Sequence, residues 1–163
     1  MTLTAHAIVG AGVAALIPAH PVLGVCAAFA SHFLVDAIPH YDYQIRSESV
    51  RPQIGAPMKF DRALLHDFLA IGSDCLLGLM LAVFFFGTAA TWLLILIAAF
   101  AGQFPDALQF AYSRWKHQPL VSLQKFHHSV HTKRRLREHP MLGITSQIFF
   151  IAAVVVAVQA LIA

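Results

Sequence analysis

All eleven Lys and Arg residues of this 163-residue chain fall in two segments, residues 41–62 and 113–137, and long apolar stretches fill most of the rest. Only 12% of the residues are charged, against about a quarter in soluble domains. A helix needs about 20 apolar residues to cross the roughly 30 Å hydrocarbon core of a bilayer. The sequence therefore predicts an all-α membrane protein that forms a single integral-membrane helical domain over residues 1–163.

We expect about five helices, arranged as an N-terminal helical hairpin followed by three transmembrane helices. As one straight helix, residues 3–37 would be roughly 50 Å long, which exceeds one span. Pro18 and Pro21 interrupt this stretch. Because proline is disfavoured in a helix interior, a turn between two antiparallel helices is predicted there. The expected helices cover about residues 3–17, 21–38, 62–86, 89–112 and 141–163.

The basic segments also predict an orientation. With five helices, both segments lie on the same side of the membrane. Lys and Arg are enriched in cytoplasmic loops, so this side is predicted to be cytoplasmic. The same topology puts nine of the ten histidines on that side and leaves only His20 in the opposite turn. A random scatter of histidines would not sort in this way, which indicates a polar site that faces the cytoplasm.

The most informative stretch is residues 31–42, where an apolar run ends in a polar segment. His32 and Asp36 are one helical turn apart and share a face. Pro39 is expected to end the helix just before His40. Imidazole nitrogens and carboxylate oxygens are ligands for zinc and similar divalent metals. The alternative interpretation is a polar helix terminus with two capping side chains.

Further candidate ligands come from every segment that reaches the same side. His127 and His131 would lie one turn apart if their segment is helical, and this spacing suits a shared metal ion. The candidate metal ligands are His6, His32, Asp36, His40, His66, Asp106, His127 and His131. Since a catalytic zinc ion takes about three protein ligands, this set predicts two or three Zn²⁺ ions that share bridging carboxylates.

Zinc lowers the pKa of a bound water molecule and polarises an ester oxygen, so hydrolysis is the predicted reaction. Asp42 or Asp74 would orient or deprotonate the water, and His128 would protonate the leaving group. A site at membrane depth favours an amphiphilic substrate. Taken singly, Asp74 and His6 also fit a hydrogen-bonded contact between helices, and Asp67 fits a capping or surface group.

Three motifs together resemble a known family. They are His6 in the sequence Thr-Ala-His-Ala, residues 36–42 (Asp-Ala-Ile-Pro-His-Tyr-Asp) and residues 126–129 (Phe-His-His-Ser). The combination resembles bacterial inner-membrane metal-dependent hydrolases of the YdjM-like family, with a different residue order in the second motif and without the Arg-Gly that precedes the third. The pair His32 and Asp36 is also similar to metal-binding motifs of zinc-dependent phospholipase C and nuclease P1. These resemblances imply a multi-pass protein of the bacterial inner (cytoplasmic) membrane that hydrolyses an ester, in particular a phosphoester of a lipid.

Two other functions remain open. A membrane di-iron oxygenase or hydroxylase also uses paired histidines, but here the share of carboxylates is high and the histidine clusters are few. A divalent-metal binding or transport protein would need polar groups across the whole membrane, and three of the predicted helices offer almost none in the outer half.

The basic run at residues 133–137 is most simply a topology determinant attracted to anionic lipids. Aromatic residues are not interleaved with the basic ones, so the expected partners are the lipid bilayer and an amphiphilic or phosphoester substrate, and no nucleic acid.

Overall fold

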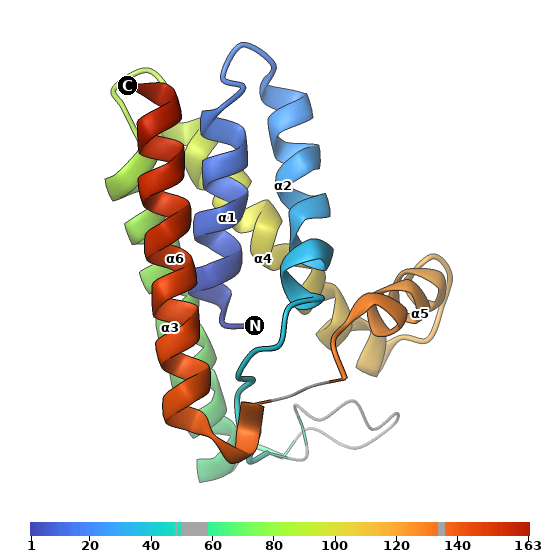
Figure 1. The fold of residues 1–163 in the computed structure, drawn as a ribbon. Helices are drawn as coiled ribbons and strands as arrows, with labels where there is room; N and C mark the ends of the chain where they lie inside the picture. The colour runs from blue at the N-terminus through green and yellow to red at the C-terminus, as the bar shows by residue number, and fades with distance from the viewer. Residues whose placement is uncertain (48, 50–58, 134–135) are drawn as a thin grey trace.

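The computed structural model describes residues 1–47, 49, 59–133 and 136–163, and its regular structure is helical (Figure 1). The α-helices in these residues are α1 (Leu3–Ala15), α2 (Pro21–Asp36), α3 (Arg62–Phe86), α4 (Trp92–Arg114), α5 (Leu120–Val130) and α6 (Pro140–Ile162), and η1 (Leu136–Glu138) is a single 3-10 turn. The all-α prediction is confirmed. The five predicted helices correspond to α1, α2, α3, α4 and α6, and the predicted bounds of α3 agree with the structure.

The predicted number of helices needs one correction. The segment between α4 and α6 was expected to be a connection, but it contains α5, a helix of 11 residues. The start of α4 also differs, because the residues before it form a turn rather than a helical end. In that turn the Thr91 N–H donates to the Thr88 carbonyl (3.1 Å), and the two hydroxyls lie 2.8 Å apart.

Helices α1 and α2 form the N-terminal hairpin and run antiparallel beside each other (Figure 1). Pro21 stands in the first turn of α2, where its missing N–H removes no intrahelical hydrogen bond. The two helices are in close contact, since a Cβ built on Gly24 would lie 3.3 Å from the Ala14 Cα. The hairpin returns the chain, so His6 on α1 and the C-terminal end of α2 lie at the same end of the bundle.

Helix α1 occupies the centre of the bundle and contacts α2, α3, α4 and α6. Glycines on its neighbours allow this close packing. A Cβ on Gly102 of α4 would lie 2.5 Å from the His6 carbonyl oxygen, and one on Gly78 of α3 would lie 2.8 Å from the Thr4 Cα. The backbone of α1 therefore lies directly against α3 and α4, and His6 is placed inside the bundle.

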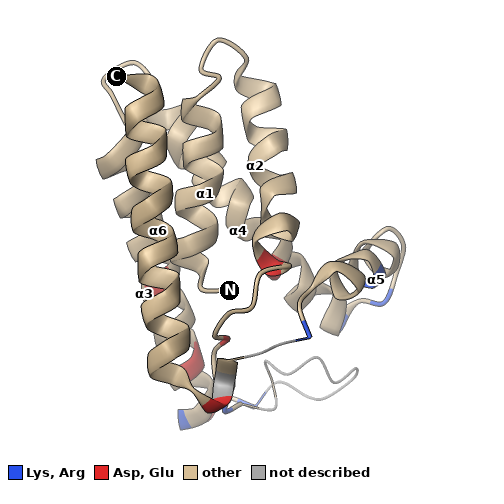
Figure 2. Ribbon diagram, viewed as in Figure 1, with Lys and Arg blue, Asp and Glu red and all other residues tan. Residues whose placement is uncertain are grey.

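Helices α3, α4 and α6 are each long and apolar enough to cross a membrane, at 25, 23 and 23 residues. Their outward faces carry large apolar side chains that the bundle leaves exposed, such as Phe84 on α3 and Phe149 on α6. Figure 2 shows that charged residues gather in the half of the bundle that contains α5 and the end of α2. This distribution suits a multi-pass membrane protein with its polar groups at one side.

Candidate metal centre

Asp36, the last residue of α2, is the centre of a buried cluster of histidines. Its side chain is 1% exposed. Its Oδ1 atom lies 3.1 Å from the His6 Nε2, and its Oδ2 atom lies 2.9 Å from the His127 Nε2 and 3.3 Å from the His32 Nε2. Three helices, α1, α2 and α5, therefore direct an imidazole nitrogen at the same carboxylate.

Further donor groups surround these residues. The Nε2 atoms of His131 and His40 lie 3.7 and 3.8 Å from the Asp36 carboxylate. Asp42 Oδ1 lies 2.7 Å from the His40 Nε2, and Asp106 Oδ1 of α4 lies 3.7 Å from the His32 Nε2. We refer to all eight residues as the His/Asp cluster; they are His6, His32, Asp36, His40, Asp42, Asp106, His127 and His131.

Two sets of ligand atoms within the cluster are compact enough to hold a metal ion. One set comprises His32, Asp36, Asp106 and His127, and the other comprises Asp36, His40 and His131. In each set the ligand atoms lie within 4.8 Å of one another. Asp36 belongs to both sets, so its carboxylate would be shared if both held an ion, as carboxylates are in two-metal sites.

Backbone carbonyls fix the orientation of three of the imidazole rings. The Nδ1 atom lies 2.8 Å from the Gly102 carbonyl oxygen in His32, 2.6 Å from that of Ile38 in His40, and 3.1 Å from that of Thr132 in His131. A carbonyl oxygen only accepts, so each Nδ1 carries a proton and donates it. In the neutral ring the Nε2 atom then has a lone pair. This atom faces Asp36 in His32 and His131, whereas the His40 Nε2 lies closest to Asp42, at 2.7 Å. The same outer hydrogen bond orients most metal-binding histidines.

Some polar atoms of the cluster find no hydrogen-bond partner within the described part of the chain. They are both ring nitrogens of His6 and the Nε2 of His40, which are buried. A neutral Nε2 lone pair facing a carboxylate oxygen is one acceptor against another, which is unfavourable in a buried site. A cation between them removes the conflict, so the residues present fit a metal ion.

Local contacts hold the C-terminal end of α2 and the residues that follow it against the chain after α5. The Thr132 N–H donates to the Asp36 carbonyl (2.9 Å), and the Leu136 N–H donates to the His40 carbonyl (2.9 Å). The Phe33 ring packs edge-on against the His127 ring, with centroids 5.4 Å apart. Residues about 90 positions apart in the sequence thereby form one site.

The surroundings shift the pKa of two groups of the cluster, His131 and Asp42. Burial lowers the pKa of His131, which favours its neutral, ligating form. Burial acts to raise the pKa of Asp42, but the adjacent His40 ring outweighs it, and the pKa of that carboxyl lies well below its usual range. Both groups lie outside the helices that could span a membrane.

Asp74 of α3 lies in a different polar cluster. Its Oδ1 accepts from the Thr4 hydroxyl (2.6 Å), and its Oδ2 accepts from the Thr4 N–H (3.2 Å) and from the Tyr43 hydroxyl. Burial and the nearby Asp74 charge raise the pKa of Tyr43. Asp74 thus links the start of α1 to the chain segment that follows Asp42, and it belongs to neither metal-binding set.

Two other residues of the predicted site also lie outside the cluster. His66 is on α3 with a side chain 44% exposed, and its nearest acidic partner is Asp67, 3.5 Å away. His128 is exposed on α5, because it follows His127 and points about 100° away from it around the helix. The structure therefore brings together seven of the eight predicted ligands, together with Asp42, and leaves out His66, Asp74 and His128.

The sequence did not predict the structural roles of two residues, Gly102 and Asp67. Gly102 both permits the close approach of α1 and provides the carbonyl that orients His32. Asp67, expected to cap or to lie at the surface, is buried and accepts from the backbone N–H groups of Arg46 (3.1 Å) and Ser47 (2.7 Å). A glycine on an apolar helix is a sign of close packing, but no local signal identifies the loop that Asp67 binds.

Comparison of the chain with protein-family models, with curated proteins and with solved structures found no match. The function must therefore be argued from the His/Asp cluster itself.

Proposed function

We propose that this protein is an integral-membrane, metal-dependent hydrolase whose centre is the His/Asp cluster. The observation that carries the proposal is the shared position of Asp36 in two compact sets of ligand atoms. The rest of the proposal is that the ions are zinc, that the cluster faces the cytoplasm and that the substrate is an ester, in particular a phosphoester of a lipid or another amphiphile.

The ligands divide between two ions. His32, His127 and Asp106 would hold the first ion together with one oxygen of Asp36, and His40 and His131 would hold the second together with the same carboxylate. The second ion would have three protein ligands and would keep a coordination position for a substrate or a water molecule, as in catalytic zinc sites, whereas the four ligands of the first ion would fill a tetrahedral shell. When bound, the zinc ions polarise an ester oxygen and lower the pKa of a water molecule.

Asp42 is the residue to which we assign proton transfer. It lies after the end of α2 and is 15% exposed, whereas Asp36 is 1% exposed. A carboxylate that is ionised, partly accessible and next to the ligand His40 can orient an attacking water molecule and accept its proton. Asp106, at 32%, is the most exposed acid of the cluster, so substrate is proposed to enter between Asp42 and Asp106.

An amphiphilic substrate follows from the position of the cluster. Large apolar side chains on α3, α4 and α6 face outward, and the cluster lies at the end of α2 where charged residues gather (Figure 2). A lipid in the surrounding bilayer could place its headgroup ester at this depth. The opposite half of the bundle carries no Lys, Arg, Asp or Glu, which favours a one-sided enzyme over a metal transporter.

The proposal is tested by purifying the full chain in lipid nanodiscs and measuring its metal content by elemental analysis. We expect about two zinc ions per chain, together with hydrolysis of bis(4-nitrophenyl) phosphate or of a phospholipid. The His20→Ala variant, altered in the turn between α1 and α2, is the control and should retain both properties. Iron in place of zinc would support the oxygenase alternative, and the absence of any bound metal would overturn the proposal.

A further inference from the structure

Helix α5 differs from the other helices in its placement. It projects sideways from the bundle instead of running along it (Figure 1), and its main contacts are with α4 and α2. It is also too short to span a bilayer, at 11 residues. It contacts α2 through the His127 and Asp36 side chains (2.9 Å) and through the Phe126 ring, which lies 5.0 Å from that of Phe33.

The two faces of α5 have different chemistry. Leu120, Leu123, His127 and Val130 follow a spacing of three and four residues, so they share one face. His127 is buried in the cluster, and the other three are half-buried. Lys125 lies on the opposite face and is exposed. The rotation of α5 that places His127 against Asp36 therefore also fixes which face the helix turns outward.

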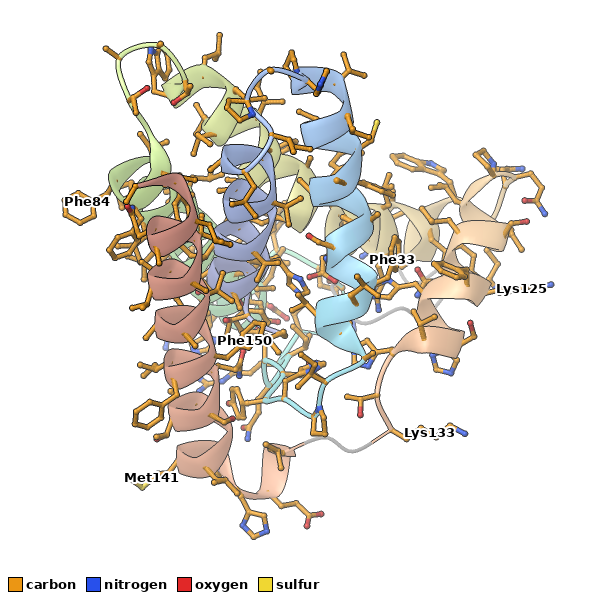
Figure 3. The ribbon with its side chains drawn as sticks, turned by 45° about the horizontal axis from the view of Figure 1, so that its top comes forward. Phe33, Phe84, Lys125, Lys133, Met141 and Phe150 are labelled. Atoms are coloured by element: carbon orange, nitrogen blue, oxygen red, sulfur yellow. The ribbon has the colours of Figure 1, made fainter. Side chains whose placement is uncertain are left out.

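Exposed aromatic and cationic side chains lie on α5 and on the segments before and after it. Trp115 and Phe126 are 63% and 50% exposed. Lys116, Lys125 and Lys133 are exposed, and Figure 3 shows Lys125 and Lys133 pointing away from the bundle. The sequence has no acidic residue between positions 106 and 138 that would compensate these charges. Tryptophan at the membrane interface and lysine near anionic headgroups are typical of a helix that lies in the membrane surface.

We propose that α5 is an interfacial helix that binds the anionic headgroups of the membrane, and that this binding holds His127 against Asp36. Anionic lipid would then strengthen metal binding, because α5 carries Lys125 and a metal ligand, and Lys116 and Lys133 lie in the segments on either side of it. This inference deepens the proposed function and rests on it, since it adds a means by which the lipid surface regulates the same metal centre.

The experiment compares zinc affinity of the full chain in nanodiscs of phosphatidylcholine alone and of phosphatidylcholine with phosphatidylglycerol. We expect the affinity to rise about fivefold or more with the anionic lipid, the usual lower range of coupling between two sites. The triple variant Lys116→Gln, Lys125→Gln, Lys133→Gln should lose this rise. A matched control, Arg46→Gln, Lys59→Gln, Arg62→Gln, removes the same charge near the other basic segment and should keep it.

A second readout reports the position of α5 without any metal. In a Trp92→Phe background, Trp115 is the remaining tryptophan of the chain. Its fluorescence should be quenched by brominated phosphatidylglycerol, and the triple lysine variant should reduce the quenching.

Three outcomes would overturn the inference. The first is an affinity rise that the triple lysine variant retains, because such a rise reflects zinc concentrated at the anionic surface. The second is an equal zinc affinity in both lipids. The third is Trp115 fluorescence that brominated lipid does not quench. A chain that binds zinc equally well in both lipids would remove this inference and leave the proposed metal centre standing. A chain that binds no zinc in either lipid would remove both.

Discussion

Asp36 and Asp74 are two helix-borne carboxylates in the same half of the bundle, and their neighbours differ in kind. Asp74 accepts hydrogen bonds from hydroxyl and amide groups of Thr4 and Tyr43. Asp36 accepts from the Met1 ammonium group (2.8 Å) and also faces the ring nitrogens of several histidines, among them His32, whose Nδ1 proton is already donated to a backbone carbonyl. The neighbours of Asp74 are all hydrogen-bond donors, whereas those of Asp36 include ring nitrogens that carry a lone pair in the neutral form and can bind a metal ion. Asp74 therefore links α3 to the start of α1 and to Tyr43, whereas Asp36 belongs to sets of ligand atoms that could hold a metal ion.

Among the variants that test this difference, we expect replacement of Asp36 to have the largest effect on zinc content and hydrolysis. Asp36→Asn removes the charge shared by both sets of ligand atoms, so we expect the loss of all bound zinc and of hydrolysis together. Elemental analysis of the purified variant measures the first, and turnover of bis(4-nitrophenyl) phosphate measures the second. Full zinc content in Asp36→Asn would contradict the assignment of Asp36 as the bridging ligand.

Asp42→Asn should separate metal binding from turnover. We expect the variant to retain its zinc and to lose a factor of roughly 10²–10⁴ in turnover, the range for a group that transfers a proton. Zinc content and hydrolysis rate are measured on the same preparation as for Asp36→Asn. If Asp42→Asn loses its metal as fully as Asp36→Asn does, Asp42 is a ligand and the base lies elsewhere.

Gly102→Ala tests whether the cluster depends on helix packing. The added Cβ would lie 2.5 Å from the His6 carbonyl oxygen, so α1 and α4 must separate and the carbonyl that orients His32 must move. We expect zinc affinity to fall about 10- to 100-fold, as for other losses of outer hydrogen bonds at metal sites. Gly72→Ala is the matched control, because its Cβ meets no atom within 4 Å. Equal zinc affinities in the two variants would contradict the dependence of the cluster on the packing of α1 against α4.

Asp74→Asn should affect stability rather than metal content. The amide replaces an acceptor oxygen with a donor that faces the Thr4 or Tyr43 donors, so we expect a loss of about 1–3 kcal/mol. A thermal unfolding scan should show a midpoint lower by several degrees, while zinc stoichiometry stays at the wild-type value. Loss of zinc at unchanged stability would place Asp74 among the ligands and end the contrast with Asp36.

The smallest effect is expected for His66. Its exposed side chain is outside the cluster, so His66→Ala should change stability by less than about 0.5 kcal/mol and should leave zinc content unchanged. His127→Ala, which removes a ligand of the first set, is the matched variant and should lower zinc content. A loss of zinc in His66→Ala would show that α3 contributes a ligand in the working protein.

The sequence predicts the parts of this site that depend on local periodicity. His32 and Asp36 are one turn apart on α2, and the prolines of the turn after α1 return the chain so that His6 reaches them. Both follow from helix geometry and from the cost of burying polar groups in an apolar layer. The bounds of α3 follow from the length of its apolar run and from Asp61, whose side chain accepts from the Leu64 N–H (2.8 Å).

The remaining features depend on contacts between distant residues. Judged by residue type alone, Asp74 is as good a metal ligand as Asp36. Only its neighbours Thr4 and Tyr43, which are 70 and 31 positions away, show that its carboxylate oxygens already accept hydrogen bonds. Helix α5 escapes recognition because 11 residues in a polar, basic segment give a weak helical signal. His66 has the residue type of a ligand, and only the packing of α3 turns it outward.

The most direct test of the central claim is zinc X-ray absorption spectroscopy of the full chain in nanodiscs, read for the distance between the two metal ions. A carboxylate bridge by Asp36 predicts nitrogen and oxygen ligands at about 2.0–2.1 Å and a second zinc ion at roughly 3.5–4 Å. The second-zinc signal should vanish in Asp36→Asn and persist in Asp74→Asn. A zinc shell with sulfur at about 2.3 Å, or an isolated zinc ion in the unaltered protein, would contradict the account.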